Sequence, residues 1–220
     1  MVFLLYIFKY IQYNQFCSWD PFGPIGENMN KRITTQQIVG TGLLLALEII
    51  FQVIGNYVQF GPVSINLSLV AIVLAAVLYG PLSGAILGFF CGIIVLFSPS
   101  TLAIFMPISP IGTVLACLFK TTLAGLIAGY VYKLFRNKNQ IVGTVVASIL
   151  VPVINTGIFS TICLIFFRPI LASGAGNESF GSMMTFLIVG FIGWNFLIEL
   201  VTTIVVSTIL ALVLVRRKVA

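Results

Sequence analysis

The chain has 220 residues, of which 60% are hydrophobic and only 7% are charged. Soluble domains carry about 25% charged residues, so this composition excludes that class and predicts an integral membrane protein. At about 20 residues per spanning helix, plus connecting segments, the chain has room for about five to seven crossings. The net charge of +6 lies in short clusters at the ends of apolar runs, so it indicates orientation and contact with anionic lipid, not nucleic-acid binding.

Few residues suited to catalysis occur in the chain. It has no histidine, and its four cysteines are scattered singly, so we expect no metal site and interpret the cysteines as small core residues. The only aspartate, Asp20, lies outside the apolar runs, and no P-loop phosphate-binding segment is present. These features exclude the known classes of membrane protease and an ATPase within this chain. We therefore expect no enzyme and no cofactor.

Residues 1–28 differ from the rest of the chain. The first eight residues are apolar but too few to span a bilayer, and no small-residue cleavage site follows them. Met29-Asn-Lys-Arg32, by contrast, is typical of the start of a bacterial membrane protein. We interpret residues 1–28 as a dispensable N-terminal extension, with a short interfacial helix as the alternative, and residues 29–220 as one membrane domain.

Three basic clusters set the expected orientation. They are Lys31-Arg32 before the apolar region, Lys133-Leu-Phe-Arg136-Asn-Lys138 in its middle, and Arg216-Arg217-Lys218 after it. Lys and Arg are retained on the cytoplasmic side during insertion, so all three clusters should share that side. An even number of crossings must then separate each cluster from the next.

The apolar runs satisfy this parity, because four of them precede the middle cluster and two follow it. The expected spans cover residues 38–54, 67–78, 82–97, 112–134, 141–167 and 184–215. The predicted fold is an all-α membrane protein with six transmembrane helices and both termini cytoplasmic. Residues 56–66, with Gly61-Pro62 as a turn signal, and the small polar segment 171–182 are expected to be loops.

The second and third apolar runs are short for a hydrocarbon layer of about 30 Å. We expect that neighbouring residues extend them, or that the bilayer is thinned at that edge of the protein. A Tyr-Gly-Pro sequence at 79–81 predicts a sharp break between the two runs. Gly84, Gly88 and Gly92 recur at every fourth position of the third run, which predicts a surface for close packing of another helix.

Residues 98–110 connect the third and fourth runs in an unusual way. Pro99, Pro107 and Pro110 forbid a continuous helix, yet residues 102–106 are apolar. Irregular backbone at membrane depth is stable only where protein or a water-filled cavity surrounds it. We interpret this segment as an extracytoplasmic flap over a cavity, with a plain surface loop as the alternative.

Ionisable side chains inside the apolar runs are costly, so they indicate function unless they are paired. Three occur: Glu48 in the first run, Lys120 in the fourth and Glu199 in the sixth. Glu199 belongs to a stripe of polar residues at four-residue steps, which must face the interior of the bundle. The other members of the stripe are Asn195, Thr203 and Ser207.

A structural interpretation of these polar groups remains open. In it, Lys120 pairs with Glu48 or Glu199 and ties two helices together. Asn155 would then bond to the backbone that Pro152 frees from the regular helical pattern.

In the functional interpretation, which we favour, Asn155, Asn195 and Glu199 bind a solute. These three residues lie in the last two apolar runs, and Trp194 beside them offers a flat surface for stacking. The polar side chains would then be retained for binding rather than for stability.

Four segments in a fixed order resemble a known family. They are Gly42-x-x-x-Ala46, Leu78-Tyr-Gly80-Pro81-Leu-Ser-Gly84, Pro152-Val-Ile-Asn155-Thr-Gly157 and Asn195-Phe-Leu-Ile-Glu199. Within a six-span chain of this length, their order resembles the substrate-binding S component of energy-coupling factor (ECF) vitamin transporters. The similarity extends over residues 29–217.

The resemblance implies a multi-pass subunit of the cell membrane that captures a water-soluble vitamin or a related small molecule from outside. A shared transmembrane coupling protein and two cytoplasmic ATPases would drive uptake. The family's small-residue contact surface for the coupling protein corresponds to Gly42 and Ala46. Its substrate site corresponds to Asn155, Trp194, Asn195, Glu199 and Lys120.

Two other functions remain as alternatives: a structural membrane protein without a ligand, and a small channel. A channel needs a polar column that continues through the membrane. The inner halves of the fourth and fifth runs are apolar, which argues against one.

Overall fold

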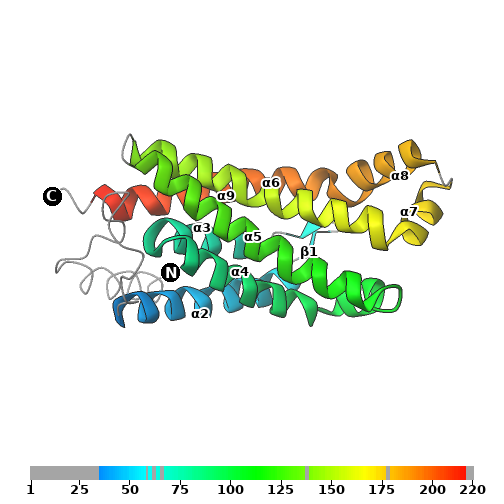
Figure 1. The fold of residues 1–220 in the computed structure, drawn as a ribbon, viewed down its shortest axis with the longest axis horizontal. Helices are drawn as coiled ribbons and strands as arrows, with labels where there is room; N and C mark the ends of the chain where they lie inside the picture. Colours follow the sequence, from blue (N-terminus) through cyan, green and yellow to red (C-terminus); the bar gives the residue numbers. More distant parts are fainter. Residues whose placement is uncertain are drawn as a thin grey trace.

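The computed structural model describes residues 35–57, 59–60, 63–64, 67–136, 139–176 and 179–216. These residues form long helices side by side, with short elements near their ends (Figure 1). The elements are α2 (Thr35–Tyr57), β1 (Gln59–Phe60), β2 (Val63–Ser64), α3 (Ser68–Tyr79), α4 (Pro81–Leu96), π-helix η1 (Thr101–Phe105), α5 (Pro110–Arg136), α6 (Gln140–Phe166), α7 (Arg168–Ala175), α8 (Phe180–Phe186), π-helix η2 (Leu187–Ile192) and α9 (Gly193–Arg216). The expectations for residues 1–28 and for the Gly61-Pro62 turn fall outside the described residues.

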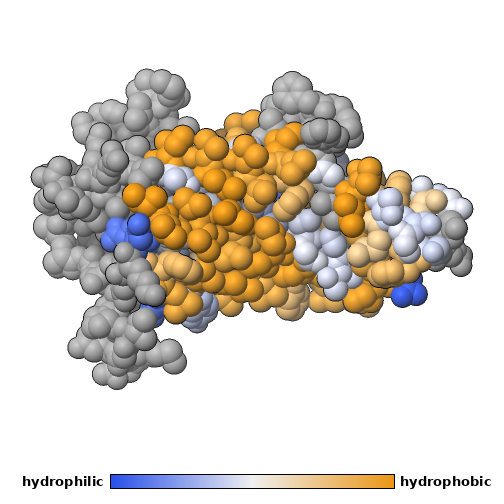
Figure 2. All heavy atoms as spheres, turned by 90° about the horizontal axis from the view of Figure 1, so that it is seen from above, coloured by the Kyte–Doolittle hydropathy of each residue, from blue (hydrophilic) through white to orange (hydrophobic). Residues whose placement is uncertain are grey.

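Three helices within the described ranges are long and apolar enough to cross a membrane. They cover Gln37–Gly55, Pro110–Phe135 and Gln140–Phe166, close to the expected first, fourth and fifth spans. The remaining apolar helices, α3, α4 and two stretches within 180–210, are shorter. Hydrophobic residues cover the middle of the face seen in Figure 2, as a lipid-facing surface requires.

The helix ends that adjoin the three basic clusters in the sequence lie at one end of the molecule. The start of α2, the end of α5 with the start of α6, and the end of α9 lie together at that end (Figure 1). The short helices α7 and α8 lie at the opposite end. The chain therefore runs along the long axis of the molecule an even number of times between one cluster and the next, in agreement with the expected parity.

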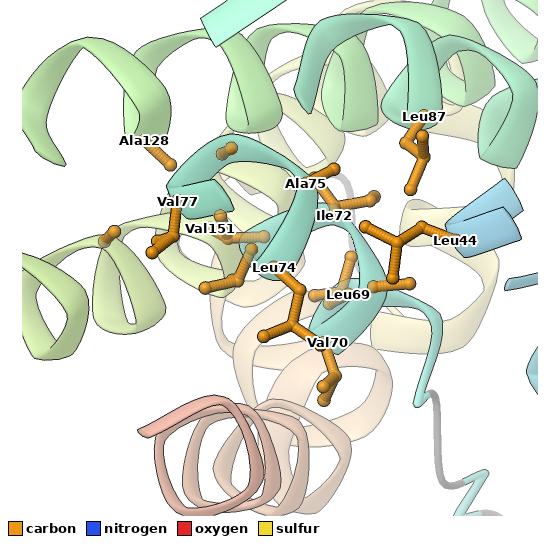
Figure 3. Close-up of a cluster of buried hydrophobic side chains, with 14 of the residues drawn as sticks. Leu44, Leu69, Val70, Ile72, Leu74, Ala75, Val77, Leu87, Ala128 and Val151 are labelled. Carbon is orange, nitrogen blue, oxygen red and sulfur yellow. The ribbon is translucent and has the colours of Figure 1, made fainter. Parts of the chain in front are cut away.

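Helix α3 is enclosed by other helices. Every residue from Leu69 to Val77 is at most 3% exposed. The surrounding side chains include Leu44 of α2, Leu87 of α4, Ala128 of α5 and Val151 of α6 (Figure 3). The expectation of a thinned bilayer at the protein edge is therefore wrong for this run. A helix of 12 residues is only about 18 Å long, but an enclosed helix need not match the thickness of the hydrocarbon layer.

A single residue, Gly80, joins α3 to α4. Its φ of 98° lies in the left-handed region, which glycine adopts without steric cost. Pro81 then begins α4, a position at which the missing N–H costs nothing. The predicted break at 79–81 is therefore confirmed.

Helices α4 and α5 pack backbone to backbone. A Cβ atom added at Gly84 would lie 2.7 Å from the carbonyl oxygen of Gly125, and one at Gly88 would meet the carbonyl oxygen of Thr121. Gly92, one turn further along, likewise faces the backbone of α5. The predicted packing surface of the glycine column is confirmed, and its partner is α5.

Two expectations for the last third of the chain need correction. The loop expected at 171–182 is partly helical, because α7 continues to Ala175 and α8 begins at Phe180. Pro169 fits the first turn of α7, where a proline is favourable. The last span, expected as one helix over 184–215, is interrupted by η2 before α9 begins at Gly193.

The α4–α5 contact makes a prediction about stability. We expect Gly88→Leu to lower the free energy of unfolding by more than the ~1–3 kcal/mol of ordinary overpacking. The added side chain would meet the backbone of α5, which, unlike a side chain, cannot move to another rotamer. Thermal unfolding and the yield of monodisperse protein in detergent measure this. Gly157→Leu is the matched control, since a Cβ at this exposed helical glycine meets nothing within 4 Å. Equal melting temperatures for the two variants would contradict the packing.

Candidate functional site

A cavity of about 290 Å³ lies where α4, η1, α5, α6 and α9 approach one another. Four of the residues predicted to bind substrate line this cavity: Lys120, Asn155, Asn195 and Glu199. They come from three helices: α5 and α6, which follow each other in the sequence, and α9. The structure thus brings these predicted residues together, while their role as ligands for a solute stays a prediction.

The wall from α5 carries Thr113, Cys117 and Lys120 at helical spacing, so the three side chains lie on one face. The ammonium nitrogen of Lys120 lies 5.0 Å from the ring centroid of Phe159 on α6. This is the geometry of a cation–π contact, which stabilises a partly desolvated cation. Within the described part of the chain, Lys120 is seen in this contact and in no ion pair.

The wall from α6 carries Asn155, Thr156 and Phe159. Asn155 is 8% exposed, and its Oδ1 atom accepts no hydrogen bond from any described residue. The unpaired Oδ1 does not test the structural interpretation, because the backbone group that Pro152 frees is a carbonyl, to which the amide N–H of Asn155 would donate. A buried acceptor without a donor destabilises the folded state by about 1–3 kcal/mol. Asn155 therefore destabilises the protein unless a bound molecule supplies the donor.

The wall from α9 carries Asn195, Phe196 and Glu199. The polar stripe continues from there through Thr203 and Ser207, both of which are fully buried. The prediction that this stripe faces the interior of the bundle is confirmed. Trp194 belongs to α9 by its backbone, but its side chain falls outside the described residues.

Residues 98–110 border the cavity, as expected for a flap. The segment is more regular than predicted, because residues 101–105 form the π-helical turn η1. The hydroxyl of Ser98 donates to the hydroxyl of Thr101 at 2.8 Å, which holds the start of this turn. Phe105 packs edge to face against Phe159 and Phe167, with ring centroids 5.9 Å and 5.1 Å away.

Glu48 lies apart from the cavity. It is fully buried on α2, and neither carboxyl oxygen has a hydrogen-bond partner among the described residues. The structural interpretation that pairs it with Lys120 is therefore wrong.

The predicted partner surface lies on the outside of α2. Gly42 and Ala46 are both exposed, and a Cβ atom at Gly42 meets nothing within 4 Å. A second hollow of about 360 Å³ lies beside Gly42, between α2, α3 and α4. Its floor includes Thr41 and Ser83, whose hydroxyl groups are hydrogen-bonded at 3.2 Å. At Gly42, therefore, no described part of the chain covers this face of α2.

Sequence reasoning missed the aromatic walls of the cavity. Phe105, Phe159 and Phe167 line it, yet they are three of 19 phenylalanines, and composition alone does not distinguish them from the others. Helical spacing offered one signal, because Phe159 lies four residues after Asn155 and so shares its face.

An apolar helical molecule with a polar cavity among its helices has the architecture of a solute-binding membrane protein. A family model described as "ECF transporter, substrate-specific component" matches residues 36–214. The chain therefore belongs to the substrate-specific components of ECF transporters. These components bind substrate for a coupling module with ATPases and are not enzymes. Comparisons with curated proteins and with solved structures gave no match.

The unpaired Oδ1 atom of Asn155 leads to a prediction about the stability of the protein. Asn155→Leu removes a buried polar group of similar size, so we expect the solute-free protein to become more stable by about 1 kcal/mol. Thermal unfolding in detergent after removal of bound solute measures the change. Ser148→Ala, also on α6, is the control: its hydroxyl is fully buried but donates to the Thr144 carbonyl at 2.8 Å, so no gain is expected. A melting temperature for Asn155→Leu well below that of the wild type would contradict the prediction.

Proposed function

We propose that this chain captures a water-soluble vitamin or a related small molecule from outside the cell and presents it to a coupling module for ATP-driven uptake. The observation that carries this proposal is the convergence of Lys120, Asn155, Asn195 and Glu199 on one cavity. Polar and ionisable side chains in apolar helices are costly, and a solute that pairs with them accounts for their position. Trp194 is proposed as a further substrate contact.

We propose six membrane crossings, with both termini in the cytoplasm and the cavity opening outward. The basic clusters support this topology through the retention of Lys and Arg on the cytoplasmic side. The common position of the start of α2, the α5–α6 junction and the end of α9 supports it as well (Figure 1). Residues 29–220 would form the functional domain in a bacterial cell membrane.

We propose that Gly42 and Ala46 contact a helix of the transmembrane coupling protein, which itself would bind two ATPase subunits. Small residues four apart allow two helix backbones to approach closely. Their exposure and the open space beside Gly42 support the proposal, because the described helices leave this surface uncovered.

The substrate site is tested with solute extracted from the purified protein and identified by mass spectrometry. The identified solute is then titrated against wild type, Asn195→Ala and Glu199→Gln. We expect affinity to fall about 10- to 100-fold in each variant, because the solute group that loses its partner is left unpaired in a dehydrated cavity. Thr161→Val, at an exposed position of α6 away from the cavity, is the control. Unchanged affinity in both variants would disprove this placement of the site.

The partner surface is tested with Gly42→Leu combined with Ala46→Leu. We expect normal solute binding, because both side chains point away from the core, together with loss of co-purification with the coupling module and of uptake. Gly157→Leu is the matched control, an exposed glycine on α6 whose added side chain also meets open space. Normal co-purification of the double variant would place the contact elsewhere.

A further inference from the structure

The cavity presents charged groups of opposite sign from different helices. Lys120 of α5 offers an ammonium group, which only donates hydrogen bonds, and Glu199 of α9 offers a carboxyl group, which accepts them when ionised. Within the described part of the chain, the ammonium group of Lys120 contacts the ring of Phe159. A solute in the cavity therefore meets both a donor and an acceptor of hydrogen bonds.

Asn155 adds a second acceptor to the cavity. Its Oδ1 atom is buried and accepts no hydrogen bond from the described residues. A bound molecule satisfies this atom only if it carries an N–H or O–H group at that position. An aprotic anion would leave the oxygen of Asn155 unpaired and would also face Glu199.

The remaining lining favours a flat ring. The ammonium group of Lys120 lies over the ring of Phe159, and Phe105 packs edge to face against both Phe159 and Phe167. Aromatic walls favour planar ligands through stacked and edge-to-face contacts. The volume of about 290 Å³ lies at the small end of the usual range for ligand pockets, ~300–1,000 Å³, so the solute has one small ring system.

We infer that the substrate is a small planar molecule that carries both an anionic group and an N–H donor group. The anionic group contacts Lys120, the donor contacts Asn155 Oδ1 and Glu199, and the ring lies against Phe159. This inference rests on the proposed function, since it assumes that the cavity is the substrate site. It goes further by excluding cationic, aliphatic and purely anionic solutes.

Four small probes that differ by one feature each test the inference on the purified full-length protein. 4-Aminobenzoate has the ring, the anion and an uncharged donor; 4-aminobenzamide lacks the anion; benzoate lacks the donor; and trans-4-hydroxycyclohexanecarboxylate keeps the anion and an uncharged donor but lacks the flat ring. Isothermal titration of solute-free protein measures each affinity. We expect 4-aminobenzoate to bind about 10- to 100-fold more tightly than each of the others, because each loses one charged or hydrogen-bonded contact.

Variants assign each preference to a residue. Lys120→Met should abolish the preference for 4-aminobenzoate over 4-aminobenzamide. Asn155→Leu should reduce the preference over benzoate, because Glu199 remains as a second acceptor. Both readouts are ratios within one folded protein, so a change in stability does not alter them. Lys133→Met, on the same helix but outside the cavity, should leave both ratios unchanged.

The outcomes separate this inference from the proposed function. If 4-aminobenzoate shows no advantage, or if Lys120→Met preserves the carboxylate preference, the inferred solute class is wrong. If mass spectrometry then identifies a bound solute that lacks an anion or a donor, the proposed function stands with a different substrate class. If no solute is extracted and no probe binds, the proposed function fails together with the inference.

Discussion

The complete burial of α3 is the constraint on which the rest of the structure depends. Its 12 residues are apolar on every side between Ser68 and Tyr79, so no face of this helix is suited to water. Helices α2, α4, α5, α6 and α9 all pack against it, and together they hide it from lipid as well. The bundle is therefore arranged around a short central helix, and the longer helices supply the lipid-facing surface (Figures 2 and 3).

The close contact between α4 and α5 determines where the cavity lies. Gly92 meets the backbone of α5 at Cys117, and Cys117 itself lines the cavity beside Lys120. The position on α5 from which Lys120 extends is thus set by backbone packing, which side-chain motion cannot relax. Phe105 of η1 contacts Phe159 and Phe167, so η1 is held by the same aromatic side chains that form the wall.

Much of the fold followed from simple patterns in the sequence. Length and apolarity located α2, α5 and α6, because those helices are long enough for the pattern to be unambiguous. Polar residues in apolar runs identified four lining residues of the cavity, because such residues are costly in lipid. The enclosure of α3, the helix α7 and the break at η2 could not be predicted, because they depend on which elements become neighbours. The aromatic walls were hidden among lipid-facing phenylalanines for the same reason.

Helix α4 contributes to the walls of both the cavity that contains Lys120 and the hollow beside Gly42. Ser83 lines the outer hollow beside Gly42, and Val95, about 18 Å further along the helix, lines the cavity that contains Lys120. The glycine column leaves no space for a side chain between α4 and α5, so a displacement of α4 requires α5 to follow. A partner that shifted these two helices at the hollow beside Gly42 would therefore also change the shape of the cavity, and by thermodynamic reciprocity a solute that fixes the cavity would oppose that shift.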